Sequence, residues 1–468
     1  MTDLLVIAPE LVLSVMALSV IVVARHLRRA RAAAIWVVVA GAAAAFSAVW
    51  LDGPASGFGG TVAADGAARF FKVLFAATLA VAALLSVRHL DAERVPPGEF
   101  YALLLLSSTG MMLAASAAEL LVLYLGLELM TLCSYVLVGV TRDRPISNEA
   151  AIKYFLLGSF ASALLLYGIG ITYGVTGTTE FVAIASAISE RGLGQQPLLL
   201  VGVALVAGGL AFKIAAVPFH AWAPDAYQGA SAPVAAFLAA GSKAAGLAAL
   251  IRVGLVAFAP EQRIWSAILL GLAVLSMIVG SLLAVSQTNV KRLLAYSSIA
   301  HAGYALLGLV PGTPDGASAT MTYSLVYAFM ILGAFGIVTG LGQRGEELEG
   351  YHGLAAVAPV RAALMFLFLL SLTGIPPTAG FVAKFAVILS AVRAGYVALA
   401  VLAVLCTAVS AFFYLRVAVL MYMHMTESPG PAPARFPVGV SAAVVVAASV
   451  IILGGLFPDS FTPWTVPP

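Results

Sequence analysis

Charge is scarce in this chain. Only 10% of its 468 residues are charged, whereas 62% are hydrophobic. Soluble globular domains carry about 25% charged residues, so a chain this apolar cannot cover itself with a water-facing surface. The formal net charge of +3 is too weak a bias to indicate a nucleic-acid partner. These shortages exclude an ordinary soluble protein and point to the bilayer as the solvent.

Cofactor motifs are also missing. The two cysteines, Cys133 and Cys406, stand alone in apolar runs, so neither a disulfide framework nor an iron–sulfur site is expected. The sequence has no Walker loop, no GxGxxG after a strand and no histidine pair spaced for haem. We therefore expect no metal, no bound cofactor and no redox chemistry on this chain; any electrons would travel through other subunits.

Long apolar runs are what the sequence has in abundance. A helix that spans a bilayer needs roughly 20 apolar residues, and these runs are too long and too uniform for barrel strands. We therefore predict an all-α, polytopic transmembrane bundle of about 14 helices. The predicted spans cover residues 4–24, 33–50, 69–87, 100–117, 120–140, 150–174, 196–217, 231–258, 264–286, 291–311, 317–341, 357–392 (interrupted), 396–424 and 437–457.

The distribution of lysine and arginine predicts the orientation. Fourteen of them fall in loops after odd-numbered spans. Six are assigned to the opposite side: Arg69, Lys72, Arg191, Arg252, Arg263 and Arg393. Basic residues concentrate in cytoplasmic loops. The odd loops are therefore predicted in the cytoplasm and both termini outside, which an even number of spans allows.

Four ionisable side chains lie inside the predicted spans: Glu128, Lys213, Lys243 and Lys384. Each costs about 2.5–3.5 kcal/mol at the centre of a membrane helix. One alternative is that the lysines reach the headgroups or form structural ion pairs with Glu128. Three lysines cannot all be neutralised by one carboxylate, however, and burial disfavours a charged amine. We therefore predict that this set gains and loses protons.

Prolines interrupt two of the predicted spans close to these lysines. Pro218 follows Lys213, whereas Pro376 and Pro377 precede Lys384. Broken backbone at membrane depth is tolerated inside protein or beside a wet cavity. Breaks in spans 7 and 12 are typical of two inverted five-helix repeats, spans 4–8 and 9–13, with an ion path at the breaks; ordinary proline kinks are the alternative. The predicted domains are 1–99, 100–258, 259–424 and 425–468.

His301, in the tenth predicted span, is either a proton shuttle between the two halves or a hydrogen-bonding partner only. Other residues near the path are accessory candidates. Lys153 and Lys291 are alternatively interfacial anchors, and His220 and Asp225 alternatively cap a helix end. The accessory set is Lys153, His220, Asp225, Lys291, Tyr296 and Tyr304. No role is predicted for Glu10 or Arg416.

Three segments together indicate a known family. They are KIAAVPFHAWAPDAYQGASAPV from Lys213, KRLLAYSSIAHAGY from Lys291 and GIPPTAGFVAKF from Gly374. Together they resemble the antiporter-like membrane subunits of respiratory complex I and of multisubunit cation/proton antiporters, over about residues 100–425. Within this group the chain resembles the subunit N family of NADH–quinone oxidoreductase. It has no long lateral helix, it carries Lys384 where subunit M usually has a glutamate, and EAAIKYFLLGSFASA from Glu149 reads like subunit N.

The resemblance implies roles for the buried residues. Glu128 and Lys213 match the interacting pair of the family, Lys243 its linking lysine, His301 its partner on the tenth span and Lys384 its exit-side lysine. It implies proton movement from the cytoplasm to the outside of a bacterial plasma (inner) membrane, coupled to quinone reduction elsewhere in the enzyme.

The resemblance also implies partners. These are subunits M, K and J of the membrane arm, together with lipids, while FMN, iron–sulfur clusters and quinone are expected in other subunits. Two alternatives remain at this point. One is a subunit of a multisubunit sodium/proton antiporter complex, which would use the same lysines. The other is a membrane scaffold that has lost transport.

Overall fold

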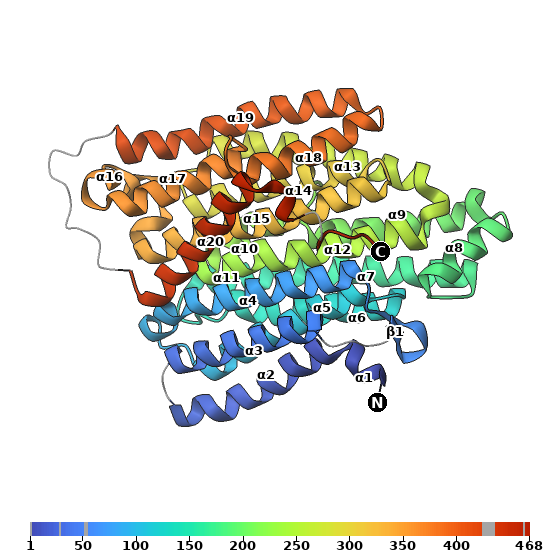
Figure 1. The fold of residues 1–468 in the computed structure, drawn as a ribbon, viewed down its shortest axis with the longest axis horizontal. Coiled ribbons are helices and arrows are strands. Elements are labelled where there is room, and N and C mark those ends of the chain that lie inside the picture. Colours follow the sequence, from blue (N-terminus) through green and yellow to red (C-terminus); the bar gives the residue numbers. More distant parts are fainter. Residues whose placement is uncertain (1, 28–29, 51–54, 424–435, 462–463) are drawn as a thin grey trace.

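The computed structural model describes residues 2–27, 30–50, 55–423, 436–461 and 464–468. Within these ranges nearly every element is a helix (Figure 1). The two named strands are the antiparallel pair β1 (Ser56–Gly57) and β2 (Val62–Ala63). The predicted all-α fold class is confirmed. The predicted domain limit between residues 424 and 425 falls outside the described residues.

The helices follow one another with short connections. The first are α1 (Thr2–Val6), α2 (Ala8–Leu27), α3 (Ala30–Trp50), α4 (Gly66–Ala92), α5 (Pro97–Ser116), α6 (Leu120–Val138), α7 (Pro145–Thr176), α8 (Phe181–Glu190) and α9 (Pro197–Lys213). Next come α10 (Trp222–Gly229), α11 (Ala232–Phe237), α12 (Lys243–Arg252), α13 (Gln262–Val285), α14 (Val290–Leu309) and α15 (Pro314–Leu341). The last are α16 (Leu354–Val357), α17 (Pro359–Thr373), α18 (Ala379–Arg393), α19 (Val397–Tyr422) and α20 (Val438–Leu456).

Short tight or wide helical turns complete the chain. The 3₁₀ turns are η1 (Phe58–Gly60), η2 (Leu193–Gln195), η5 (Ala259–Glu261), η6 (Gly342–Glu346), η7 (Leu348–Tyr351) and η8 (Pro458–Ser460). Two π-helical turns flank α12: η3 (Leu238–Ser242) and η4 (Val253–Ala257). Single π turns inside helices often mark functional sites, and η3 ends directly before Lys243.

Every predicted span contains a helix, and ten helices of the described chain are long and apolar enough to cross a membrane. The other four predicted spans contain helices that are too short or too polar to meet this criterion. The proline breaks shorten α9 to 17 residues and α17 and α18 to 15 each. Helix α14 has a lower hydropathy because it carries Lys291, Arg292 and His301. The apolar part of α2 covers Ala8–Val22.

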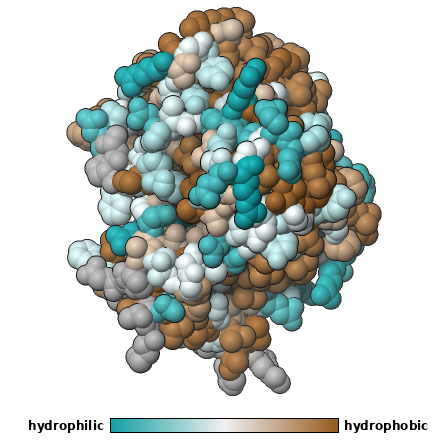
Figure 2. All heavy atoms as spheres, turned by 90° about the vertical axis from the view of Figure 1, so that its right-hand side faces the viewer, coloured by the Kyte–Doolittle hydropathy of each residue, from teal (hydrophilic) through white to brown (hydrophobic). Residues whose placement is uncertain are grey.

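The long helices lie side by side along one direction of the molecule (Figure 1). We call the end that carries α8 the α8 end and the opposite end, which carries α16, the α16 end. Both termini lie toward the α8 end (Figure 1), as an even number of crossings requires. Seen from the α8 end, polar side chains gather near the middle and apolar ones dominate around them (Figure 2). Large exposed apolar side chains such as Phe160 and Phe412 suit contact with lipid.

Both predicted breaks are present. Helix α9 ends at Lys213, and α10 begins at Trp222 after a segment in which the Val217 amide donates to the Ser276 hydroxyl at 2.9 Å. Helix α17 ends at Thr373, and Gly374 takes the left-handed conformation that commonly terminates helices. Each break lies in the fourth span of a five-span unit. Because five is odd, the second unit crosses the bilayer in the opposite sense to the first.

Tertiary packing accounts for two residues that had no predicted role. Glu10 forms a buried ion pair with Lys72 at 2.9 Å and accepts a hydrogen bond from Ser116. Arg416 donates to the carbonyls of Val285 and Gln287 and so caps the end of α13. Lys72 was assigned to the outer side of the membrane in the orientation argument, and that assignment is wrong because its side chain is only 4% exposed.

Candidate functional site

Lys213 and Glu128 form an ion pair in the first five-span unit. The Lys213 amine lies 3.1 Å from a Glu128 carboxylate oxygen and donates to the Thr131 hydroxyl at 2.8 Å. The Ser162 hydroxyl donates to Glu128 and lies 3.4 Å from the Lys213 amine. Lys213 is 2% exposed and Glu128 18%. The Ser162 hydroxyl therefore bridges the two ions, whereas Thr131 contacts Lys213 alone and donates to the Leu127 carbonyl.

Lys243 is as buried as Lys213 but has a different environment. Its amine donates to the carbonyl of Ser298 on α14 at 2.5 Å. Among the described residues, no carboxylate lies within ion-pair distance of it. A desolvated amine without a counter-ion is held far more easily in its neutral form. Lys243 therefore suits a proton carrier that is charged only transiently.

A small cavity connects Lys243 with His301. Both side chains line it, together with Tyr323 and Tyr327. The cavity leaves about 10 Å³ for the centre of a water molecule, which is room for roughly one water. Of the residues that line it, Tyr327 has a buried hydroxyl with no hydrogen-bond partner within the described part of the chain. Buried hydroxyls of this kind commonly hold ordered water.

His301 is held by two tyrosines. Its Nδ1 lies 2.6 Å from the Tyr323 hydroxyl, and its Nε2 lies 3.3 Å from the Tyr414 hydroxyl. Tyr414 in turn shares a hydrogen bond with Ser297. Both ring nitrogens are thus connected to hydroxyls, so the imidazole can accept a proton on one nitrogen and release one from the other.

Lys384 lies at the break in the second unit. Its amine donates to the carbonyls of Leu372 and Thr373 at 3.3 and 2.9 Å, and it lies 4.4 Å from the centre of the Tyr304 ring. The carbonyls belong to the last turn of α17, where the helix dipole favours positive charge. Lys384 is 4% exposed and, among the described residues, forms no ion pair.

Charged residues from the first turns of α7, α10 and α14 form a cluster at the surface. Asp225 accepts from Lys153 at 3.0 Å and from Arg292 at 2.7 Å. Lys153 also pairs with Glu149. The cluster lines a surface cavity of about 190 Å³. Lys153 therefore contacts two carboxylates of this surface cluster, Asp225 and Glu149.

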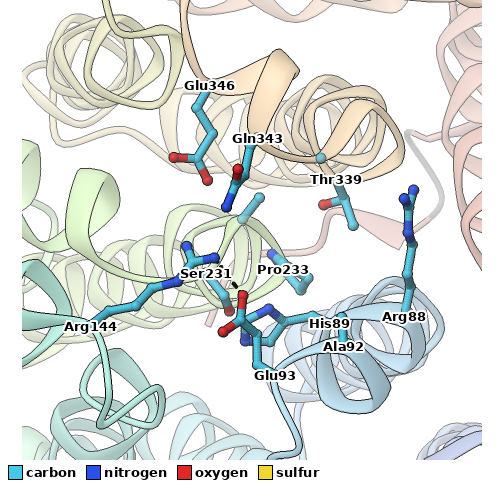
Figure 3. A pocket seen from close by; sticks show the side chains of 12 residues that line it. Arg88, His89, Ala92, Glu93, Arg144, Ser231, Pro233, Thr339, Gln343 and Glu346 are labelled. Carbon is cyan, nitrogen blue, oxygen red and sulfur yellow. Dashed lines mark hydrogen bonds and ion pairs between the residues drawn. The ribbon is translucent and has the colours of Figure 1, made fainter. Parts of the chain in front are cut away.

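A second polar cavity, of about 230 Å³, also lies at the α16 end (Figure 3). Arg144 and Glu93 point toward each other across it and form an ion pair, while Gln343 and Glu346 project from the opposite side (Figure 3). Glu346 also pairs with Lys291 at 3.1 Å. Lys291 is 2% exposed, so the interpretation of this residue as an interfacial anchor is wrong.

The remaining accessory candidates lie in different surroundings. Tyr304 packs beside His301, with ring centres 5.9 Å apart. Tyr296 lies against Arg292, because five residues along a helix place a side chain on a different face from His301. The Nδ1 of His220 is buried and lacks a partner within the described chain. No group of three or more His, Cys, Asp or Glu side chains that could hold a metal occurs among the described residues.

Sequence reasoning missed the hydroxyl partners. Thr131, Ser162, Tyr323 and Tyr414 contact the ionisable side chains directly. Only Thr131, three residues after Glu128, could have been found from helical spacing. The others come from distant segments, and nothing in the sequence separates them from the many other hydroxyl residues in apolar runs.

Comparisons with known proteins show the family to which the chain is similar. The transmembrane family described as NADH:quinone oxidoreductase/Mrp antiporter matches residues 117–411. NADH-quinone oxidoreductase subunit N of Desulfovibrio desulfuricans is 44% identical, over 99% of this chain and 96% of the relative. The same subunit of Trichlorobacter lovleyi is also 44% identical, over 98% and 95%.

Solved structures are similar as well. A chain of respiratory complex I from Thermus thermophilus superposes with a TM-score of 0.81 at 34% identity and covers 97% of this chain and 98% of its own length. A chain of the Mrp complex from a Dietzia species has a TM-score of 0.84 at 23% identity, covers 98% and 96%, and is similar in fold.

Proposed function

The chain belongs to the NADH-quinone oxidoreductase subunit N family, and on this premise we propose that it carries protons across the membrane as a subunit of that enzyme. One observation carries the proposal. Lys213, Lys243 and Lys384 are all buried, and among the described residues only Lys213 of these three has a carboxylate partner. Amines that are buried without counter-ions are poor structural elements and good transient proton carriers.

We place proton uptake at the α16 end, which faces the cytoplasm in this proposal. Two polar cavities open there, around Asp225 and around Glu93. Glu128 controls whether the Lys213 amine is protonated. While the pair is closed, the carboxylate stabilises the ammonium; when the pair opens, the desolvated amine releases its proton toward Lys243.

The proton then moves through the middle of the bundle. Water in the small cavity would link Lys243 to His301, and the unpartnered Tyr327 hydroxyl would hold that water. Lys243 and His301 line the same small cavity, so positive charges on the two side chains repel each other. A proton on Lys243 therefore raises the free energy of a second proton on His301, which favours movement in single steps rather than simultaneous loading.

Lys384 is the last carrier in this scheme. The carbonyls at the end of α17 stabilise its charged form until the break between α17 and α18 admits water from the outside. Quinone reduction in other subunits supplies the free energy. FMN, iron–sulfur clusters and quinone belong to those subunits, and we place subunits M, K and J beside this chain in a bacterial inner membrane, with both termini outside.

We also propose that function divides along the chain. Residues 100–258 and 259–424 would form the two half-channels, while residues 1–99 and 425–468 would support them. The polar residues described above support this division, because Lys213 and Lys243 belong to the first unit and His301 and Lys384 to the second.

The test measures proton translocation and electron transfer separately. The assembled enzyme is reconstituted in vesicles with Glu128→Ala or Lys213→Ala, and protons moved per NADH oxidised are recorded. We expect a lower ratio in both variants, with electron transfer continuing. Arg393→Ala, which removes an exposed charge from the end of α18, serves as the control and is expected to keep the wild-type ratio. Wild-type ratios in both site variants would refute the proposal.

A further inference from the structure

A groove on the outer surface runs between α3, α4 and α20 near the α16 end. Its volume is about 280 Å³, and its lining is almost entirely aliphatic, including Ile35, Leu84, Val87 and Ala442. The floor is closed where α20 approaches α4: a Cβ atom on Gly439 would lie 2.7 Å from the Leu84 carbonyl oxygen. The groove is therefore a fixed feature of the helix packing.

Positive charge gathers where the groove meets the α16 end. Arg31 lines the groove itself. Arg88 lines the neighbouring polar cavity and not the groove, and it donates to the Gly340 carbonyl at 3.1 Å. The Arg361 guanidinium lies 4.1 Å from the centre of the Phe436 ring, one residue before the lining residue Pro437. No acidic side chain is among the described residues that line the groove.

We propose that this groove binds an anionic phospholipid, with an acyl chain along α3 and α20 and the phosphate beside Arg31. Each buried methylene of an acyl chain contributes to binding, so an apolar channel between helices favours a lipid chain. Basic pockets between transmembrane helices on the cytoplasmic side attract acidic headgroups. The combination of an aliphatic groove with arginines at one end only matches the two parts of such a lipid.

A photoactivatable phosphatidylglycerol can test the site in the whole enzyme. The assembled complex is reconstituted in phosphatidylcholine bilayers that contain a small fraction of this probe, irradiated and mapped by peptide mass spectrometry. We expect labelling of the α3 and α20 peptides. Arg31→Gln should lower it about fivefold, which is the effect of one basic residue near an anionic headgroup. Ala442→Trp, which fills the groove and leaves the charge unchanged, should lower it as well.

Two controls match these variants. Arg393→Gln removes an exposed arginine elsewhere, and Ala408→Trp adds the same bulk to an exposed position of α19; both should label like wild type. A photoactivatable phosphatidylcholine should label the groove several-fold less. Equal labelling by the two lipids, or full labelling of both groove variants in assembled enzyme, would overturn the proposal. So would crosslinking of these peptides to another subunit in place of lipid.

Discussion

The amine of Lys384 donates a hydrogen bond of 2.9 Å to the main-chain carbonyl of Thr373, the last residue of α17. Lys213 is itself the last residue of α9. Both lysines therefore lie at the carbonyl end of a broken helix, where unpaired carbonyls and the helix dipole favour a cation. The breaks provide a charge-stabilising site in an interior that would otherwise expel an ammonium.

Replacing Lys384 with arginine separates charge from proton exchange. Arginine keeps the positive charge but does not deprotonate in proteins. If Lys384 must release a proton, Lys384→Arg should lower the number of protons moved per electron as strongly as Lys384→Ala. The ratio is measured in vesicles, with Arg393→Lys at the end of the same helix as the control. A normal ratio for Lys384→Arg would show that a fixed charge is sufficient.

Tyr323 should matter through its hydroxyl. Tyr323→Phe removes the 2.6 Å contact with His301 Nδ1 and keeps the ring. The loss of about 1 kcal/mol of hydrogen bonding corresponds to about a fivefold slower proton movement through His301. Pumping rate at saturating NADH is the measurement. Tyr167→Phe, on the exposed face of α7, is the matched control; equal rates in the two variants would contradict the role of the contact.

The Glu10–Lys72 pair should stabilise the packing of α2 against α4 and α5. Glu10→Ala leaves a buried, uncompensated ammonium, which costs about 3–5 kcal/mol. We expect a lower thermal unfolding temperature of the detergent-solubilised enzyme or reduced assembly of this subunit. The double variant Glu10→Leu/Lys72→Met should recover most of the loss. Glu149→Ala removes one partner of a largely exposed pair and should have no measurable effect.

Gly126 should be irreplaceable in the contact between α5 and α6. A Cβ atom there would lie 2.6 Å from the Ala114 amide nitrogen and 2.8 Å from the Gly110 carbonyl oxygen, and backbone atoms cannot move aside cheaply. Gly126→Ala should push α6 outward, shift Glu128 and lower both stability and pumping. Gly170→Ala on α7 meets no atom within 4 Å and should be neutral or slightly stabilising. Thermal unfolding and proton ratios of both variants provide the test.

Much of the fold was predictable because the determining physics is local. A run of about 20 apolar residues must be helical in a bilayer, whatever its neighbours are. The breaks were predictable for the same reason, since Pro218, Pro376 and Pro377 remove backbone donors in their own turns. The predicted lysines lie beside these breaks, as the sequence spacing of Lys213 and Lys384 requires.

The side-chain partners were not predictable in the same way. Asp65 and Arg252 pair across 187 residues, whereas the sequence assigned Arg252 only to the outer side of the membrane. Lys291 looked like a surface anchor because it begins a helix, yet Glu346 pairs with it in the interior. Hydropathy scales score a residue by its type and not by what it meets, so they cannot separate a snorkelling lysine from a buried one.

By itself, the sequence determined that this chain crosses a membrane many times, that two crossings are interrupted, and that amines remain inside where charge is costly. Those properties depend on residues within one helix. Only the tertiary structure decided which amine has a carboxylate, which has carbonyls alone, and which hydroxyls connect them. The free energy of a buried proton depends on groups a few ångströms away in space, and those groups come from helices that are far apart along the chain.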